Sequence, residues 1–244
     1  MPPGDGSVVG RYSERRSPRS DPTLETIELE TRSGPRFSVI WLHGLGADAH
    51  DFEPIVPELV RAHWPALRFV FPNAPVRPIT VNGGMRMRGW YDIGGADIAS
   101  KQDEVGIRAS IGAINTLIAR EGERGIAPSN ILLAGFSQGG AITLAAGLRQ
   151  RTPLRGLIAL STYLPLHHTY ETEAAPESFG VPIFMGHGRF DPVVPEALGL
   201  MSRDWIAAKG NKITWKSYPM PHSVCAEEVR DLATWMEAQL VLGS

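Results

Sequence analysis

The sequence predicts an α/β protein whose mostly parallel central sheet is covered by helices on both faces. Strand-like runs recur along the chain, and most are separated by segments in which apolar residues return every three or four positions, as in a helix. A Gly-Phe-Ser-Gln-Gly motif at 135–139 stands between one such run and a helix-like run of small residues. Because parallel strands need long crossover connections, this alternation favours a parallel sheet.

Seven segments are expected to be strands. Residues 26–30 alternate polar and apolar side chains, which is typical of an edge strand, whereas 37–42 is nearly all apolar, as a central strand is. The other five are expected over 67–71, 129–134, 156–160, 181–187 and 213–218.

Five segments have helical spacing of their apolar residues. They are 51–63, 103–120, the stretch from the 135–139 motif to about 149, 195–209 and 226–240. Residues 72–101 have no clear periodicity and are rich in glycine and proline, so a long connection is expected there. A connection of that length in a compact domain usually has a function.

The length of 244 residues suits a single domain, expected over 24–244, and the 43% hydrophobic content allows a large core. Residues 1–23 are rich in proline, glycine and arginine and offer little apolar surface to bury. They are predicted to form a flexible tail, with a basic docking arm as the alternative.

Composition argues against several function classes. The formal net charge is -2, and no block of charge suggests nucleic acid or a membrane surface as partner. No apolar run is long enough to span a membrane, and no signal peptide is evident. The one cysteine, Cys225, excludes an intramolecular disulfide, so a reducing, cytoplasmic location is expected. Cys225 itself is expected to be a small buried residue rather than a reactive thiol.

Ser137 is the candidate nucleophile. A G-x-S-x-G motif on a strand-turn-helix corner holds its serine in a strained backbone with the hydroxyl raised above the sheet. A serine hydroxyl is a weak nucleophile, so it needs a general base that a carboxylate orients. In a hydrolase of this topology the chain order is serine, then acid, then histidine.

His222 is the candidate base. It lies in a proline-stiffened loop between the last predicted strand and the last predicted helix. The other downstream histidines are less suitable: His187 ends a strand and is expected to be structural, and His167 and His168 are expected on a solvated loop.

Asp191 is the candidate acid because it follows a strand in a Gly/Pro turn, between Ser137 and His222 in the chain. Its alternative role is to cap the helix that follows. The oxyanion of the tetrahedral intermediate needs backbone N–H donors, expected from Gln138 and from Leu45, which lies in the loop after an early strand. Losing one such donor costs roughly 3–4 kcal/mol of transition-state stabilisation.

The same loop, Gly44-Leu45-Gly46-Ala47-Asp48-Ala49, also fits a dinucleotide fingerprint. That site needs an acidic residue at the end of the next strand, and the chain has Phe71-Pro72-Asn73 there. The dinucleotide interpretation is therefore disfavoured, and no zinc or calcium motif is present in the sequence.

These motifs together resemble the bacterial carboxylesterase and acyl-protein thioesterase family, the phospholipase/carboxylesterase group of α/β-hydrolases. Seven pieces match in order, at 42–48, 71–75, 89–93, 135–140, 161–165, 187–191 and 221–224. The resemblance implies an α/β-hydrolase fold and no metal or organic cofactor. It assigns Ser137, Asp191 and His222 to the catalytic triad and Leu45 and Gln138 to the oxyanion hole. It also implies that Trp90 and Leu164 line the acyl pocket, that 76–92 forms a flap, and that a homodimer can form.

The predicted activity is that of a serine carboxylesterase acting on short- to medium-chain esters through an acyl-enzyme. An acyl-protein thioesterase or lysophospholipase is the alternative, and a non-catalytic binding protein with a hydrolase fold is a more distant one. The binding protein is disfavoured because all three triad positions hold competent residues.

Overall fold

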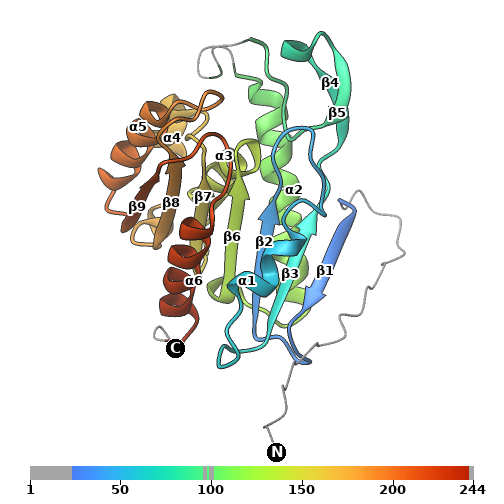
Figure 1. Ribbon diagram of the computed structural model, residues 1–244, viewed down its shortest axis with the longest axis vertical. Helices are drawn as coiled ribbons and strands as arrows, with labels where there is room; N and C mark the ends of the chain where they lie inside the picture. The colour runs from blue at the N-terminus through green and yellow to red at the C-terminus, as the bar shows by residue number, and fades with distance from the viewer. Residues whose placement is uncertain (1–23, 96–97, 99–101, 242–244) are drawn as a thin grey trace, which may run out of the picture.

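The computed structural model describes residues 24–95, 98 and 102–241. Within them lies a seven-stranded sheet in the order β1-β3-β2-β6-β7-β8-β9 (Figure 1). β1 pairs antiparallel with β3, and all other pairs are parallel. The strands are β1 Thr26–Glu30, β2 Phe37–Leu42, β3 Leu67–Pro72, β6 Ile131–Phe136, β7 Gly156–Leu160, β8 Ile183–Gly188 and β9 Ile213–Tyr218. The predicted mostly parallel sheet is confirmed, while the predicted tail lies outside the described residues.

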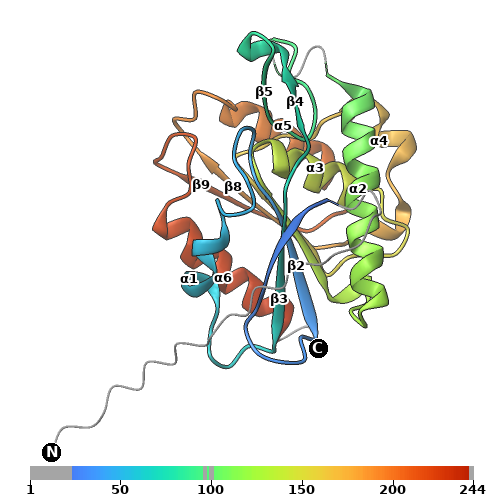
Figure 2. The same ribbon diagram turned by 90° about the vertical axis from the view of Figure 1, so that its right-hand side faces the viewer.

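Helices cover both faces of the sheet (Figure 2). One face carries α1 Val56–Leu59 and α6 Ala226–Leu240, and the other carries α2 Glu104–Glu123, α3 Gln138–Gly147, α4 His167–Glu173 and α5 Glu196–Ala207. Strand β2 shows why a strand covered on both faces has an apolar sequence. Its Ile40 side chain packs in the core under α2 and α3, and its Trp41 side chain packs in the core under α1 and α6. A strand covered on both faces must be apolar throughout.

The order of the strands reverses at β2. After β2 the chain adds β3 on one side, and after the α2 crossover it adds β6 on the other. Ligand sites of open α/β sheets lie at the carboxyl ends of strands at such a switch point. Leu42 is in register with Gly135, so the loops that follow β2 and β6 leave the sheet at the same level.

The helix predicted over 51–63 is wrong in extent. The structure has a 3-10 turn at Glu53–Ile55 followed by the four-residue α1, and Val60 is extended. Pro54 and Pro57 are each the second residue of one of these turns, and a proline has no N–H with which to continue an existing helix. The apolar spacing is helical, but the prolines limit the helix.

The segment 72–101 is more regular than predicted. It contains an antiparallel hairpin of β4 Val76–Ile79 and β5 Met85–Arg88, joined through a 3-10 turn at Thr80–Asn82. Gly83 and Gly84 have positive φ in the connection. Elsewhere, His167 and His168 are exposed as expected, but they begin helix α4 rather than lie on a loop.

Candidate active site

Ser137 occupies a strained turn between β6 and α3. Its backbone has φ +53° and ψ −119°, a conformation that non-glycine residues rarely adopt. Its N–H donates to the Leu160 carbonyl over 2.9 Å. A Cβ at Gly135 would lie 2.4 Å from the Gly139 backbone, and a Cβ at Gly139 would lie 2.4 Å from the Leu42 carbonyl oxygen. Only glycines therefore fit on either side of the serine.

His222 connects the serine to a carboxylate. The Ser137 hydroxyl lies 2.8 Å from Nε2 of His222, and Nδ1 of His222 lies 2.6 Å from Oδ2 of Asp191. A carboxylate only accepts hydrogen bonds, so Nδ1 carries the proton and Nε2 accepts from the serine hydroxyl. The Phe136 ring packs against the His222 imidazole, with 4.8 Å between the two ring centroids.

The Asp191 carboxylate is fixed before it meets the histidine. Its Oδ1 accepts from the backbone N–H groups of Val193 and Val194, each over 2.8 Å, and its side chain is fully buried. These bonds order the turn that precedes α5, but the helix cap that was the alternative for Asp191 is not formed, because the N-cap residue of α5 is Pro195 and no side chain caps it. The other carboxylate oxygen, Oδ2, bonds His222. Asp191 therefore orders its own turn and orients His222, and it does not cap the helix.

The loops that carry the acid and the base are joined at the ends of β8 and β9. Arg189 N–H donates to the Tyr218 carbonyl over 2.9 Å, and Phe190 N–H donates to the Met220 carbonyl over 3.2 Å. A Cβ at Gly188 would lie 2.4 Å from the Met220 carbonyl oxygen, so the two loops are in direct contact. The separation of Asp191 from His222 is therefore set by main-chain contacts.

His187 is also near the acid but is arranged differently. Its Nε2 lies 2.8 Å from the Val194 carbonyl oxygen and 3.7 Å from Oδ2 of Asp191. Since a carbonyl only accepts, Nε2 is a donor and cannot take a proton from a serine. Burial lowers the pKa of His187, which favours its neutral form. The structural role expected for His187 is confirmed.

The two predicted oxyanion donors belong to the elbow and to the loop beside it. Leu45 follows Gly44, whose Cβ, if present, would lie 3.5 Å from Cβ of Ser137. Gln138 is the first residue of α3, where N–H groups have no partner within the helix. Among the described residues, nothing accepts from the backbone N–H of Leu45 or of Gln138. Both donors are therefore available to an oxyanion.

Trp90 and Leu164 are both buried, with exposed fractions of 0% and 1%. Their predicted place in the lining of an acyl pocket stays a prediction. Sequence reasoning missed two polar neighbours of the elbow. Thr162 donates its hydroxyl to the Ser137 carbonyl over 2.7 Å, and the His43 carbonyl accepts from the Trp90 indole over 2.9 Å. His43 could have been found from its place directly before Gly44, whereas nothing in the sequence distinguishes Thr162.

The dinucleotide interpretation of the loop at 44–49 does not match its structure. That fingerprint requires the glycine loop to open a helix directly. Here the first helical turn begins only at Glu53, and Ala49 N–H is bonded to the Asn73 side chain. In the part of the chain that the structure describes, no cluster of three metal-ligating side chains occurs, and no helix has the length and apolar character to cross a bilayer.

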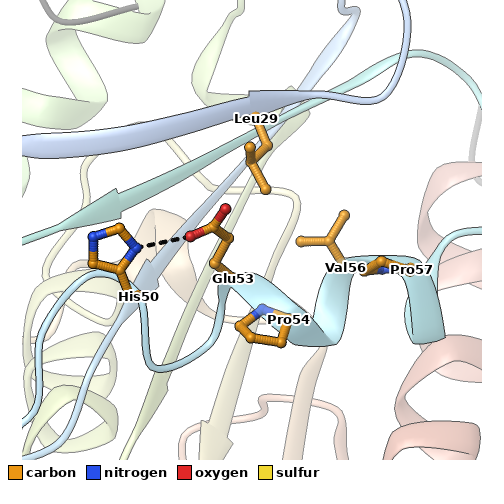
Figure 3. Close-up of a pocket in the computed structure, with 6 residues that line it drawn as sticks. All are labelled: Leu29, His50, Glu53, Pro54, Val56 and Pro57. Atoms are coloured by element: carbon orange, nitrogen blue, oxygen red, sulfur yellow. Dashed lines mark hydrogen bonds and ion pairs between the residues drawn. The ribbon is translucent and has the colours of Figure 1, made fainter. Parts of the chain in front are cut away.

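A separate groove of about 420 Å³ lies between β1 and the segment around α1 (Figure 3). His50 and Glu53, two of its lining residues, are hydrogen-bonded, with 2.9 Å between Nδ1 and Oε2. The groove is lined by Leu29, His50, Glu53, Pro54, Val56 and Pro57. None of these residues belongs to the Ser137 site.

A strained serine bonded to a His–Asp pair, at the carboxyl edge of a parallel sheet with helices on both faces, defines a serine hydrolase of the α/β-hydrolase fold. The sequence profile of the phospholipase/carboxylesterase family matches residues 27–240. The chain belongs to this family and is a serine hydrolase of the esterase type.

Two curated relatives with substantial identity are fungal proteins. Acyl-protein thioesterase 1 of Mycosarcoma maydis is 38% identical over 231 residues, which cover 88% of this chain and 96% of that protein. Acyl-protein thioesterase 1 of Neurospora crassa is 39% identical over 212 residues, which cover 83% and 86%. The sequence resemblance to a bacterial group is thus corrected, since these homologues are eukaryotic.

Solved structures give the same fold. Arabidopsis thaliana SOBER1 superposes with a TM-score of 0.80 at 29% identity, covering 84% of this chain and 99% of that one. Zea mays acyl-protein thioesterase 2 superposes with a TM-score of 0.74 at 26% identity, covering 87% and 98%.

Proposed function

We propose that this protein is an acyl-protein thioesterase that also hydrolyses simple carboxylic esters. The observation that carries the proposal is the hydrogen-bonded series Ser137–His222–Asp191. Beside it are two backbone donors, of Leu45 and Gln138, that have no acceptor within the described part of the chain. The thioester preference is supported by fungal relatives that bear the name acyl-protein thioesterase 1 at 38% and 39% identity.

In the proposed mechanism, the Ser137 hydroxyl attacks the acyl carbonyl while Nε2 of His222 takes its proton. Negative charge on the carbonyl oxygen is stabilised by the N–H groups of Leu45 and Gln138, at the positive end of the α3 dipole. The protonated His222 then gives its proton to the departing thiolate or alkoxide, and an acyl-Ser137 ester remains. Water, deprotonated by His222, hydrolyses that ester and restores the serine.

Asp191 stabilises the imidazolium that forms in both halves of this reaction. Its Oδ1 is already occupied by two backbone N–H groups, so Oδ2 holds the His222 ring in one orientation. A thiol is more acidic than an alcohol, with a pKa of about 8.5, so a thiolate leaves with less help from the protonated base. The same residues therefore suffice for both ester types.

The deciding experiment compares kcat/KM on an octanoyl thioester and an octanoyl oxygen ester, each corrected for its spontaneous hydrolysis. A thioester preference of tenfold or more, together with release of acyl groups from an S-acylated peptide, supports the thioesterase. An oxygen-ester preference would instead favour the carboxylesterase. Preferential turnover of lysophosphatidylcholine would favour a lysophospholipase.

A further inference from the structure

The Trp90 side chain contacts the loop that carries Leu45. Its indole Nε1–H donates to the His43 carbonyl over 2.9 Å, and its ring centroid is 5.4 Å from that of His43. The side chain is completely buried. A buried indole that donates to a loop carbonyl both packs against the loop and fixes the direction of one of its peptide groups.

The Trp90 backbone is in turn held by the residue after the serine. The Gln138 side chain accepts from Trp90 N–H through Oε1 over 2.8 Å and donates through Nε2 to the Tyr91 carbonyl over 2.8 Å. The amide thus bonds both sides of one short segment. Gln138 also carries one of the two backbone N–H groups assigned to the oxyanion hole. Its side chain therefore connects Trp90 directly to the elbow.

His43 completes the connection to Leu45. Ala74 N–H donates to Nε2 of His43 over 3.0 Å, so the ring proton must be on Nδ1, which donates to the Gly44 carbonyl over 2.7 Å. Burial lowers the pKa of His43 and favours this neutral tautomer. The carbonyls of His43 and Gly44 are both engaged. The Gly44 carbonyl shares its planar peptide unit with the Leu45 N–H, and the His43 carbonyl belongs to the unit before it.

Other buried tryptophans show that this bond is specific to Trp90. Trp41 and Trp64 are also almost completely buried, yet neither indole N–H has a partner in the described structure. Trp41 and Trp64 are therefore buried for packing alone, without a hydrogen bond from the indole N–H. The Trp90 N–H is instead directed at the loop beside Ser137.

We propose that Trp90 is a positioning residue of the oxyanion hole. Held by the Gln138 side chain, it fixes the His43 carbonyl and thereby directs the Leu45 N–H toward the same point as the Gln138 N–H. This inference rests on the proposed function. It gives Trp90 a role that acts through the loop at 43–45 and does not require contact with the acyl chain.

The test is Trp90→Phe, which keeps a buried ring and removes the N–H. On p-nitrophenyl butyrate we expect kcat to fall 10- to 100-fold with KM within about twofold, because oxyanion donors act mainly in the transition state. The inhibition constant of a trifluoromethyl ketone, whose serine adduct carries an oxyanion, should rise by a similar factor. Trp64→Phe is the matched control and should keep wild-type kcat, even where both variants lose similar thermal stability.

If Trp90→Phe does not fold, a second variant tests the same proposal. Gln138→Met removes the side-chain bonds to Trp90 and Tyr91 but keeps the backbone N–H, and we expect a comparable loss of kcat. The double variant should lose less than the product of the two single losses, because both act through one connection. Wild-type kcat in Trp90→Phe, or an equal loss in Trp64→Phe, would overturn the inference. Failure of the proposed function would differ, since the wild type would then prefer the oxygen ester to the thioester, or be as inactive as Ser137→Ala.

Discussion

The elbow at Ser137 and the β4–β5 hairpin lie on either side of the loop at 43–46 and are held in opposite ways. The elbow is enclosed, because neighbouring backbone leaves no room for a Cβ at Gly135 or Gly139. The hairpin projects from the body (Figure 1), with Val76 50% and Met85 64% exposed. The chemistry thus depends on a rigid corner, whereas the exposed hairpin, predicted to be a flap, is the part with more freedom to adapt to a substrate.

The largest effect is expected at the rigid corner. Ser137→Ala should reduce kcat on p-nitrophenyl butyrate by about 10⁵- to 10⁶-fold, because no nucleophile remains. Circular dichroism and the melting temperature should stay close to wild type. Activity within tenfold of wild type would exclude Ser137 as the nucleophile and remove the basis of the comparison.

Asp191→Asn should have the next largest effect. The amide can still occupy the turn, but it no longer stabilises the imidazolium and permits the wrong tautomer of His222, so kcat should fall by about 10⁴-fold. His187→Gln is the matched control, because His187 lies in the same pocket and is bonded to the Val194 carbonyl. An equal loss in both variants would indicate general damage to the loop.

Away from the hairpin, helix α6 contains a buried carboxyl, that of Glu228, which lowers the stability of the fold when it is ionised. The Glu228 carboxyl lies against Gly186 of β8, and neither of its oxygens has a hydrogen-bond partner among the described residues. Burial, followed by the charge of Asp231, raises the pKa of Glu228 from 4.5 to about 8. The folded protein keeps this group protonated where the unfolded chain ionises it, so its contribution to stability is lost as pH rises from about 4.5 to about 8.

Glu228→Met should remove this pH dependence. Its free energy of unfolding should exceed that of wild type by an amount that grows over this window, to on the order of 3 kcal/mol near pH 8. Urea unfolding at pH 5, 6.5 and 8 measures the difference. The control is Glu227→Met at the exposed neighbouring position, whose difference from wild type in free energy of unfolding should not change with pH. A pH-independent difference for both variants would contradict the raised pKa of Glu228.

The smallest effect is expected at the base of the hairpin. The Asp92 carboxylate accepts from Thr80 N–H over 2.7 Å and from the Thr80 hydroxyl over 2.5 Å. These bonds hold the pKa of Asp92 below its usual value, and the bond from the Thr80 hydroxyl has the largest effect. Asp92→Ala should loosen the hairpin and change KM severalfold with kcat within about twofold. A loss mainly in kcat would show that the hairpin is part of the rigid machinery.

The sequence was informative where chemistry requires particular residues. The serine, acid and base were predicted from their order and loop context, and their side chains meet in the structure. Helix α6 was predicted to the residue because its apolar face is uninterrupted. The hairpin was missed because β4 and β5 have four residues each and β4 contains Pro78.

Contacts that depend on tertiary structure could not be predicted. A tryptophan at position 90 is compatible with a pocket wall, with core packing and with support of a loop. The indole bond to His43, which favours support of the loop, could not be predicted from the sequence. The predicted cytoplasmic location, homodimer and acyl pocket stay predictions.

Covalent labelling at Ser137 tests the central claim most directly. The protein is treated with a fluorophosphonate, digested and analysed by mass spectrometry, and residual esterase activity is measured in parallel. We predict one adduct per chain, on the peptide that contains Ser137, with activity lost in proportion and no adduct in Ser137→Ala. Full activity without an adduct, or an adduct on Cys225 or another residue, would contradict the account.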